Sequence, residues 1–239
     1  MSDPRDTPAM QQHARFKKRH PDCVLLFRIG DFYEMFDDDA VNVSRAIGLT
    51  LTQRTAGVPM AGVPYHQLET YLRKMINAGF RVAVCEQTED ASKAKGIVQR
   101  AVTRVLTPGT LVDDTLLDEA TPTTLAAALI GDDGAGTPRV HLAVVDLSTG
   151  AFTLCDAGEG EVADELARRG VREVLFAEWR GSDAPEALSR AMRALGISGT
   201  ARPAWEFRAG EAVEALRTHF GVATLAGFDL REDDPAVHA

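Results

Sequence analysis

The chain has 239 residues, of which 45% are hydrophobic and 26% are charged, and its formal net charge is −9. This composition is typical of a globular protein and excludes a disordered or collagen-like chain. At roughly 100–200 residues per domain, the length predicts two domains, each large enough to bury its own core.

The net charge argues at first sight against a nucleic-acid partner, because phosphate binding depends on lysine and arginine. The charges are unevenly distributed, however. Residues 1–112 contain 15 basic and 12 acidic residues, a net charge of +3, whereas residues 113–239 contain 11 and 23, a net charge of −12. The first part is therefore the one suited to a polyanion.

The cysteines and the hydropathy pattern indicate a cellular compartment. Cys23, Cys85 and Cys155 are odd in number and form no Cys-x-x-Cys pair, which is typical of a reducing environment. No apolar run reaches the roughly 18 residues of a membrane span, and residues 1–12 are too polar for a signal-peptide core. We expect a soluble, cytoplasmic protein without a membrane partner.

The first helix is predicted from its start signals. Thr7 and Pro8 are typical of an N-cap followed by the first helical residue, and the helix is expected to end near Pro21. Its last turns carry Arg15, Lys17, Lys18 and Arg19. Such a basic run is most simply a solvated helix end that complements the helix dipole.

The rest of the first part alternates between strands and helices. A strand over 23–29 ends at Gly30-Asp31, and a helix with Phe36, Ala40, Val43 and Ile47 on one face follows. Further on, the patterns predict a short strand over 49–53, a loop over 57–64, a helix over 68–76 that stops at Gly79, and strands over 80–84 and 97–106. In the last strand Arg100 and Arg104 are four apart, so we expect them on one face of the sheet.

An acidic stretch over 113–122 is expected to link the two domains, 1–112 and 123–239. The second domain begins with three strands, over 123–130, 140–147 and 151–155, that predict an antiparallel meander. Helices over 161–169, 185–195 and 211–220 then alternate with strands over 173–176 and, less clearly, 204–207. This order predicts a ribonuclease-H-like α/β layer after a mixed-sheet α/β first domain.

Most catalytic motifs are missing from the sequence, including the phosphate loop, the zinc-protease motif and the serine-hydrolase elbow. Gly158-x-Gly160-x-x-Ala163 matches a dinucleotide-binding pattern, but nearby carboxylates such as Glu161 and Asp164 would repel a pyrophosphate. Asp146, in the middle strand of the ribonuclease-H-like layer, is a candidate nuclease carboxylate. Two-metal catalysis needs several convergent acids. The other candidate acid, Glu173, lies at a strand start and is expected to be exposed. A turn residue is therefore the simpler interpretation of Asp146.

A sharper pattern lies at Gly30-Asp31-Phe32-Tyr33-Glu34, which we place at a strand-to-helix junction of the basic part. Both aromatic residues could belong to the core. The loop around Met60 and the strand with Arg100 belong to the same small domain, however, and an exposed aromatic flanked by cations and an apolar loop is typical of a minor-groove wedge.

Four motifs carry a resemblance to a known family: Gly30-Asp31-Phe32-Tyr33-Glu34-Met35-Phe36, Pro59-Met60-Ala61-Gly62-Val63-Pro64-Tyr65-His66, Cys85-Glu86-Gln87 and Val105-Leu106-Thr107-Pro108-Gly109-Thr110. With these motifs in this order, the chain resembles the N-terminal region of the bacterial MutS family of DNA mismatch recognition proteins. The resemblance is strong over 7–117 and weaker over the second half, which is similar to the connector domain of that family.

The resemblance implies roles for individual residues. Phe32 matches the phenylalanine that stacks on a mispaired base, and Glu34 matches the glutamate that hydrogen-bonds it. Pro59 and Met60 match a loop that packs into the groove, and Arg54, Lys95 and Arg100 match cations that contact the DNA backbone. Gln53 stands where relatives often have lysine, which implies one phosphate contact fewer.

The resemblance also implies partners and limits. The family is an ATPase that binds ATP and Mg²⁺ and encircles mismatched or looped duplex DNA as a homodimer, with a downstream repair partner at the connector. We expect no catalysis and no cofactor on this chain, and we expect it to end before the phosphate-loop region and before the last connector helix. Two functions remain open: a non-enzymatic mismatch-recognition module, located in the cytoplasm at the nucleoid, and a structure-specific nuclease that uses Asp146.

Overall fold

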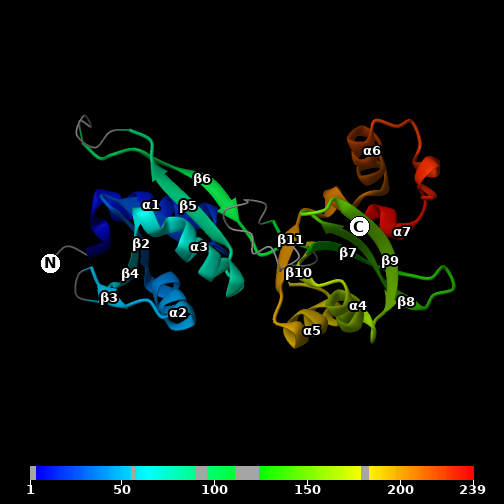
Figure 1. Ribbon diagram of the computed structural model, residues 1–239, viewed down its shortest axis with the longest axis horizontal. Coiled ribbons are helices and arrows are strands. Elements are labelled where there is room, and N and C mark those ends of the chain that lie inside the picture. The colour runs from blue at the N-terminus through cyan, green and yellow to red at the C-terminus, as the bar shows by residue number, and fades with distance from the viewer. Residues whose placement is uncertain (1–3, 55–56, 90–95, 111–123, 179–182) are drawn as a thin grey trace. The chain divides into compact units, whose positions relative to one another are not determined.

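A computed structural model of the chain describes residues 4–54, 57–89, 96–110, 124–178 and 183–239. The chain divides into two compact units, Met1–Leu117 and Asp118–Ala239, and each has its own sheet and core (Figure 1). The stretch predicted as a linker, 113–122, lies outside the described residues.

The first unit is a six-stranded sheet with helices on both faces. Its elements are η1 (Pro4–Asp6), α1 (Pro8–Arg19), β1 (Val24–Ile29), β2 (Phe32–Phe36), α2 (Asp37–Ile47), β3 (Thr52–Gln53), β4 (Pro59–Pro64), η2 (Tyr65–Gln67), α3 (Leu68–Asn77), β5 (Val82–Gln87) and β6 (Arg100–Leu106). The strand order is β3-β4-β2-β1-β5-β6, in which β1 and β5 are parallel and the other neighbours are antiparallel.

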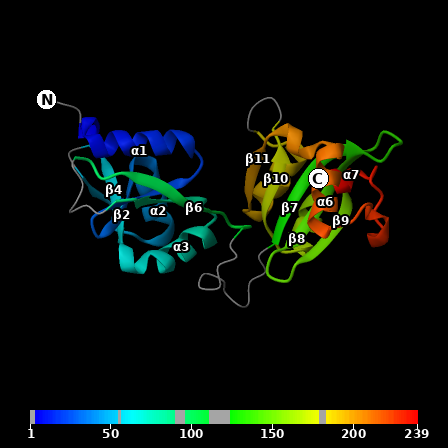
Figure 2. The same cartoon turned by 90° about the horizontal axis from the view of Figure 1, so that it is seen from above.

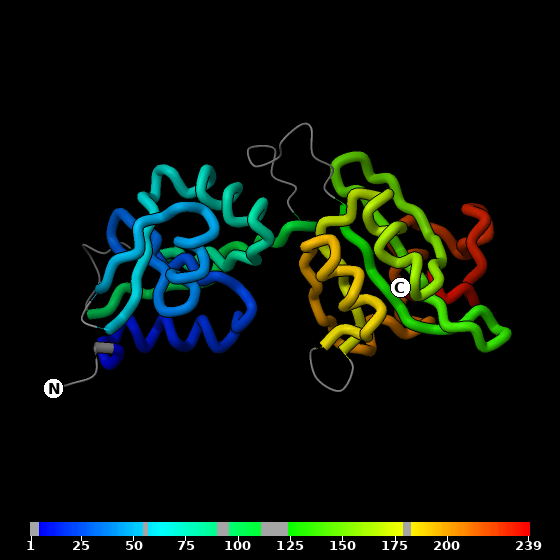
Figure 3. The backbone as a smooth tube through the Cα atoms, turned by 90° about the horizontal axis from the view of Figure 1, so that it is seen from below, coloured from blue at the N-terminus to red at the C-terminus, as the bar shows by residue number. Residues whose placement is uncertain are grey.

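Two apolar clusters hold the first unit together, one on each face of the sheet. Alternate residues of β1 separate them: Leu25 and Phe27 pack under α1, whereas Val24 and Leu26 pack under α2 and α3. Figures 2 and 3 show α1 on one face of the sheet and α3 on the other. The predicted start of α1 is confirmed, because the Thr7 hydroxyl accepts a hydrogen bond from the Met10 amide.

The residues after β1 form a β-hairpin, so their placement at a strand-to-helix junction is wrong. Gly30, with a φ of +57°, and Asp31 form a two-residue turn between the paired residues Ile29 and Phe32. The spacing of Phe32 and Phe36 fits a helix as well as a strand. Pairing with β1 on one side and β4 on the other makes this segment a strand.

The segment around Met60 is also a strand, β4, and the predicted loop is wrong over 59–64. β4 lies between β2 and β3, and its two prolines are at its ends. Proline is tolerated there because its missing N–H interrupts the hydrogen-bond ladder least at the end of a strand.

The prediction that Arg100 and Arg104 share a face is wrong because β6 contains a bulge. Cys85 pairs with Val102 but Val84 pairs with Arg104, so Thr103 is an extra residue on β6. The extra residue reverses the alternation. Arg100 faces the α1 side, over the ring of Phe27, and Arg104 pairs with Glu69 of α3 on the opposite side.

The second unit has the predicted ribonuclease-H-like topology. Its strands are β7 (Thr124–Asp132), β8 (Pro138–Asp146), β9 (Ala151–Gly158), β10 (Val171–Ala177) and β11 (Ser198–Arg202). They are arranged β11-β10-β7-β8-β9, with an antiparallel meander over β7–β9 and parallel pairing among β7, β10 and β11. Its helices are α4 (Val162–Arg168), α5 (Glu186–Leu195), η3 (Ala204–Phe207), α6 (Ala209–Phe220), η4 (Leu225–Phe228) and α7 (Pro235–His238).

Two predictions for the second unit are wrong. The strand predicted over 204–207 is a 3-10 helix, and the strand that pairs with β10 is β11, which lies just before it in the sequence. Glu173 is buried, with 1% of its surface exposed, because β10 lies inside the sheet between β7 and β11. Its Oε1 atom accepts a hydrogen bond of 2.6 Å from the Thr200 hydroxyl, which compensates the buried carboxyl.

Candidate nucleic-acid interface

Phe32 is the large exposed apolar side chain at the hairpin. It begins β2 directly after the Gly30-Asp31 turn, and 47% of its surface is exposed. Tyr33 and Met35, the residues that alternate with it, are buried in the core under α2 and α3. The alternation therefore places Phe32 on the α1 side of the sheet, at the first residue of β2, with its ring accessible from solvent.

Glu34 lies on the same side of β2 and is paired with a cation. The Arg54 Nη1 and Glu34 Oε2 atoms are 2.5 Å apart, and 15% of the Glu34 side chain is exposed. Burial raises the pKa of Glu34, and the positive charge and hydrogen bond of Arg54 act against this rise. The Arg54 guanidinium also lies 5.7 Å from the centre of the Phe36 ring, which holds it over the sheet.

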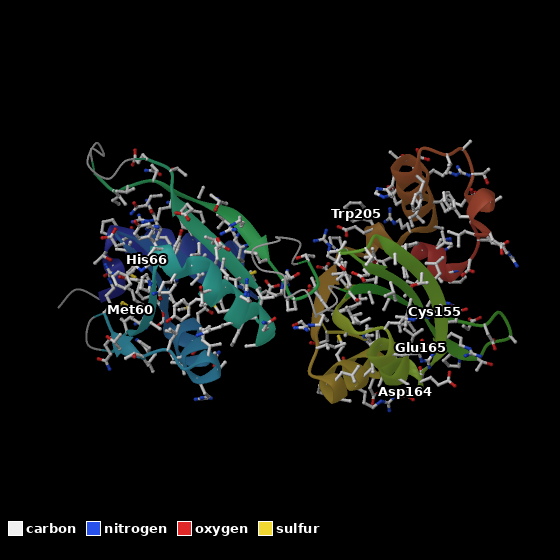
Figure 4. All side chains as sticks on the ribbon, viewed as in Figure 1. Met60, His66, Cys155, Asp164, Glu165 and Trp205 are labelled. Carbon is white, nitrogen blue, oxygen red and sulfur yellow. The ribbon has the colours of Figure 1, made fainter. Side chains whose placement is uncertain are left out.

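Two β4 residues complete this side of the sheet. Met60 pairs with Phe36 and packs at the border of the α1-side core, and Gly62 pairs with Glu34. A Cβ atom on Gly62 would lie 3.6 Å from Phe32 Cδ1, so the ring lies close over the β4 backbone. We call Phe32, Glu34, Arg54 and Met60 the Phe32 cluster; Met60 is labelled in Figure 4.

The other predicted residues stand apart from the Phe32 cluster. Pro59 pairs with Gln53 and has the opposite orientation to Met60 in the alternation of β4. Arg100 lies on the α1 side, but its Nε atom donates to the Arg28 carbonyl and its Nη1 atom to Gln12 Oε1 and the Val98 carbonyl. Lys95 lies outside the described residues.

A group of residues on the reverse side of the sheet supports the hairpin and was missed in the sequence. The Arg28 Nε atom donates to the Gly30 carbonyl at 2.5 Å, and its guanidinium lies 4.4 Å from the centre of the Tyr65 ring. The Tyr65 amide donates to the Asp31 carbonyl at 2.9 Å. The Tyr33 hydroxyl donates to Glu86 Oε1, and burial raises the pKa of Tyr33 to about 12. An arginine inside an otherwise apolar strand was the available signal.

The alternative sites have little support. Asp146 is half-buried at the end of β8, and its Oδ1 atom accepts hydrogen bonds from the amide and hydroxyl of Ser148, as expected of a turn residue. Within the described part of the chain, no three His, Cys, Asp or Glu side chains are placed to hold a metal ion.

The segment that matches the dinucleotide-binding pattern, 158–163, is surrounded by carboxylates of the chain itself. The Gly158 amide donates to Glu161 Oε2 at 3.0 Å, and α4 carries Asp164 and Glu165 in its first turn (Figure 4). These negative charges oppose a phosphate. None of the helices that the structure describes is long and apolar enough to cross a membrane.

Comparison with known proteins places both units in one family. The model of MutS domain I matches residues 7–115, and the model of MutS domain II matches residues 124–239. The chain is 41% identical to the DNA mismatch repair protein MutS of Symbiobacterium thermophilum over 248 aligned residues, which cover 100% of the chain and 28% of that protein.

Two further relatives agree. The DNA mismatch repair protein MutS of Anaeromyxobacter sp. strain K is 42% identical, over 94% of the chain and 25% of the relative, and that of Salinibacter ruber is 40% identical, over 98% and 26%. The chain thus spans about a quarter of the length of the curated relatives that it matches. Two matched domains in the expected order, on two α/β units, show that the chain belongs to the MutS family.

Proposed function

We propose that the chain recognises mispaired bases in duplex DNA, with Phe32 as a wedge that enters the minor groove and Glu34 as the residue that hydrogen-bonds the displaced base. One observation carries this proposal: an exposed aromatic ring and a largely buried carboxylate lie on one side of β2, two residues apart, in a unit that matches MutS domain I.

The wedge role follows from what an aromatic ring does to a base stack. Stacking on a base is worth about 1–3 kcal/mol and tolerates any base, so Phe32 can probe every step of the duplex. Opening and kinking a step costs less where the bases are mispaired, because such a step is easier to unstack. Discrimination then comes mainly from how easily the DNA deforms.

Glu34 adds a second test. A carboxylate near phosphates is repelled unless it gains a hydrogen bond or takes up a proton. Of the two carboxylate oxygens of Glu34, Oε2 accepts a hydrogen bond from Arg54, and Oε1 has no partner among the described residues. Oε1 is therefore the atom that would meet a base edge. Burial favours the protonated carboxyl, which can also donate to a base.

The remaining residues position the duplex. Arg54, Arg100 and Lys95 would contact the DNA backbone, and Met60 with Pro59 would pack into the groove beside Phe32. Arg100 would do so with its Nη2 atom, since its Nε and Nη1 atoms are bonded within the described fold.

The activities of the whole family lie partly beyond these two domains. We infer that ATP and Mg²⁺ binding, the assembly of a homodimer around DNA and contact with a downstream repair partner at the second unit belong to the longer proteins that this chain matches, and that this chain has no catalytic activity of its own. The proposed location is the cytoplasm, at the nucleoid.

The test is a binding titration with a matched duplex and a duplex that contains one G·T pair. We expect weak binding, because the first domain has few phosphate contacts, so the titration is made at low salt. Phe32→Ala should remove the preference for the mismatched duplex. Phe228→Ala is a suitable control, because Phe228, in the second unit, is similarly exposed at 48%.

The outcomes are distinct. Loss of the preference in Phe32→Ala alone supports the wedge. A preference that survives in Phe32→Ala, or that the unsubstituted chain does not show, overturns the proposal. Mg²⁺-dependent cleavage that disappears in Asp146→Asn would favour the nuclease instead.

A further inference from the structure

A groove with a volume of about 440 Å³ runs between α1 and β6 in the first unit. Its walls include Arg15, Phe16, Arg19 and His20 of α1 and its C-cap, and Arg100 and Val102 of β6. None of the described residues that line it is acidic. The groove therefore combines three guanidinium groups with no carboxylate among its described lining residues, in the part of the chain that carries a net charge of +3.

Two cations of the groove wall, Arg15 and Arg19, differ from several other cations of the unit. Arg5, Arg81 and Arg104 each form an ion pair with an aspartate or glutamate. Lys17, on the same helix as the groove, is bound by Asp39 and by the Cys23 carbonyl. Arg15 and Arg19 are exposed, and neither has a hydrogen bond or an ion pair to any residue that the structure describes. Their charges are therefore available to a ligand.

Arg100 gives the groove a fixed end. Its guanidinium lies 4.7 Å from the centre of the Phe27 ring, and its Nε atom donates to the Arg28 carbonyl at 2.7 Å. Three carbonyl or amide oxygens hold this guanidinium in place. The Arg100 side chain therefore loses little conformational entropy when a ligand binds. The next residue after Arg28 on β1, Ile29, pairs with Phe32.

We propose that this groove is a binding site for the phosphodiester backbone of duplex DNA, separate from the Phe32 cluster and indifferent to base sequence. Guanidinium groups suit phosphate because their planar donors can bind two of its oxygens at once. The proposal rests on the proposed function for the identity of the polyanion.

The sheet places the groove within reach of the same duplex. Arg100 and Phe32 face the same side of the sheet, and β6 lies three strands from β2. At about 4.8 Å between neighbouring strands, the separation across the sheet is about 14 Å. Successive phosphates of one DNA strand are about 3.4 Å apart along the helix axis, so this distance spans about four of them. One duplex can therefore contact both sites.

The experiment measures how the affinity of the chain for a matched duplex falls with salt. Each phosphate contact contributes about 0.9 to the slope of log K against log salt. Arg15→Gln and Arg19→Gln should each lower the slope by about 0.9, and the double variant by about twice that amount. The control is Arg45→Gln, an exposed arginine of α2, which covers the opposite side of the sheet.

The variants also separate this inference from the proposed function. The groove variants should weaken binding to the matched and the G·T duplex equally, so the ratio of the two affinities should stay unchanged. Phe32→Ala should change that ratio and leave the salt slope unchanged. An unchanged slope in the double variant, or an equal change in Arg45→Gln, overturns the groove site alone. Thermal unfolding of each variant verifies that these exposed substitutions leave the fold intact.

Discussion

Arg54 and Glu34 form an ion pair between the end of β3 and the middle of β2, with their Nη1 and Oε2 atoms 2.5 Å apart. The pair neutralises the one carboxylate that the proposed function brings close to DNA. It also determines how strongly that carboxylate holds a proton, since burial raises the pKa of Glu34 and Arg54 lowers it.

Removing the cation should therefore shift the titration of Glu34. In Arg54→Gln only the effect of burial remains, so we expect the pKa of Glu34 to rise further above its usual value. A raised pKa means that the folded state holds the proton more tightly than the unfolded state. The associated stability is full at pH values below the unfolded pKa and is lost as the pH rises through the folded pKa.

The measurement is an NMR titration of the Glu34 carboxyl carbon in the parent chain and the variant. Arg81→Gln is the control, because Arg81 pairs with Asp22 and not with Glu34. A Glu34 pKa that falls or stays constant in Arg54→Gln would contradict this account of the ion pair.

His13 should make the first unit sensitive to acid. It is buried between the rings of Phe27 and Phe36, and burial lowers its pKa from 6.5 to about 4. The unfolded chain binds the proton at a higher pH than the folded chain does. The contribution of neutral His13 to the free energy of unfolding is therefore full above pH 6.5 and is lost as the pH falls toward about 4, by about 3 kcal/mol in total.

We expect His13→Leu to reduce this loss, because leucine has no proton to bind. All three tyrosines, Tyr33, Tyr65 and Tyr71, belong to the first unit, so tyrosine absorbance in urea follows its unfolding. His66→Leu, at an exposed histidine of the same unit, is the control. The prediction fails if the parent chain and His13→Leu lose equal stability between pH 6.5 and 4.

Gly199 should be intolerant of a side chain. A Cβ atom there would lie 2.6 Å from Met192 Sδ and 3.1 Å from Phe176 Cε1, so α5 could not pack against β11 as it does. We expect Gly199→Ala to lower the free energy of unfolding of the second unit by about 1–3 kcal/mol, the usual cost of overpacking. Met192 is flexible, which favours the lower part of this range.

Gly210→Ala provides the matched comparison, because Gly210 lies in α6 and a Cβ atom there meets nothing within 4 Å. Alanine is the better helix former, so this variant should be neutral or more stable by up to about 1 kcal/mol. Both tryptophans belong to the second unit, and their fluorescence in urea measures both variants. Equal stability of the two variants would refute the packing argument.

Much of the fold could be predicted from local patterns. Thr7 and Pro8 marked the start of α1, helical spacing identified the buried face of α3, and turn residues separated β7, β8 and β9. For α2 the spacing identified Ala40 and Val43 but wrongly added Phe36, which belongs to β2 and packs on the other side of the sheet. These features depend on residues close together in the chain, whose preferences act before any tertiary contact forms. The motifs that resemble the MutS family were likewise local, and the family matches bear them out.

Only the tertiary structure decided the features that depend on partners far along the chain. Phe32 lies on a strand because β1 and β4 pair with β2, and Arg104 leaves the face of Arg100 because one extra residue enters β6. Burial of Glu173 and pairing of Arg54 with Glu34 also join residues 20 or more positions apart. A single sequence records the preference of each residue, but not which distant strand supplies its hydrogen bonds. Strand pairing therefore determined what each side chain of the Phe32 cluster and of the groove can contact.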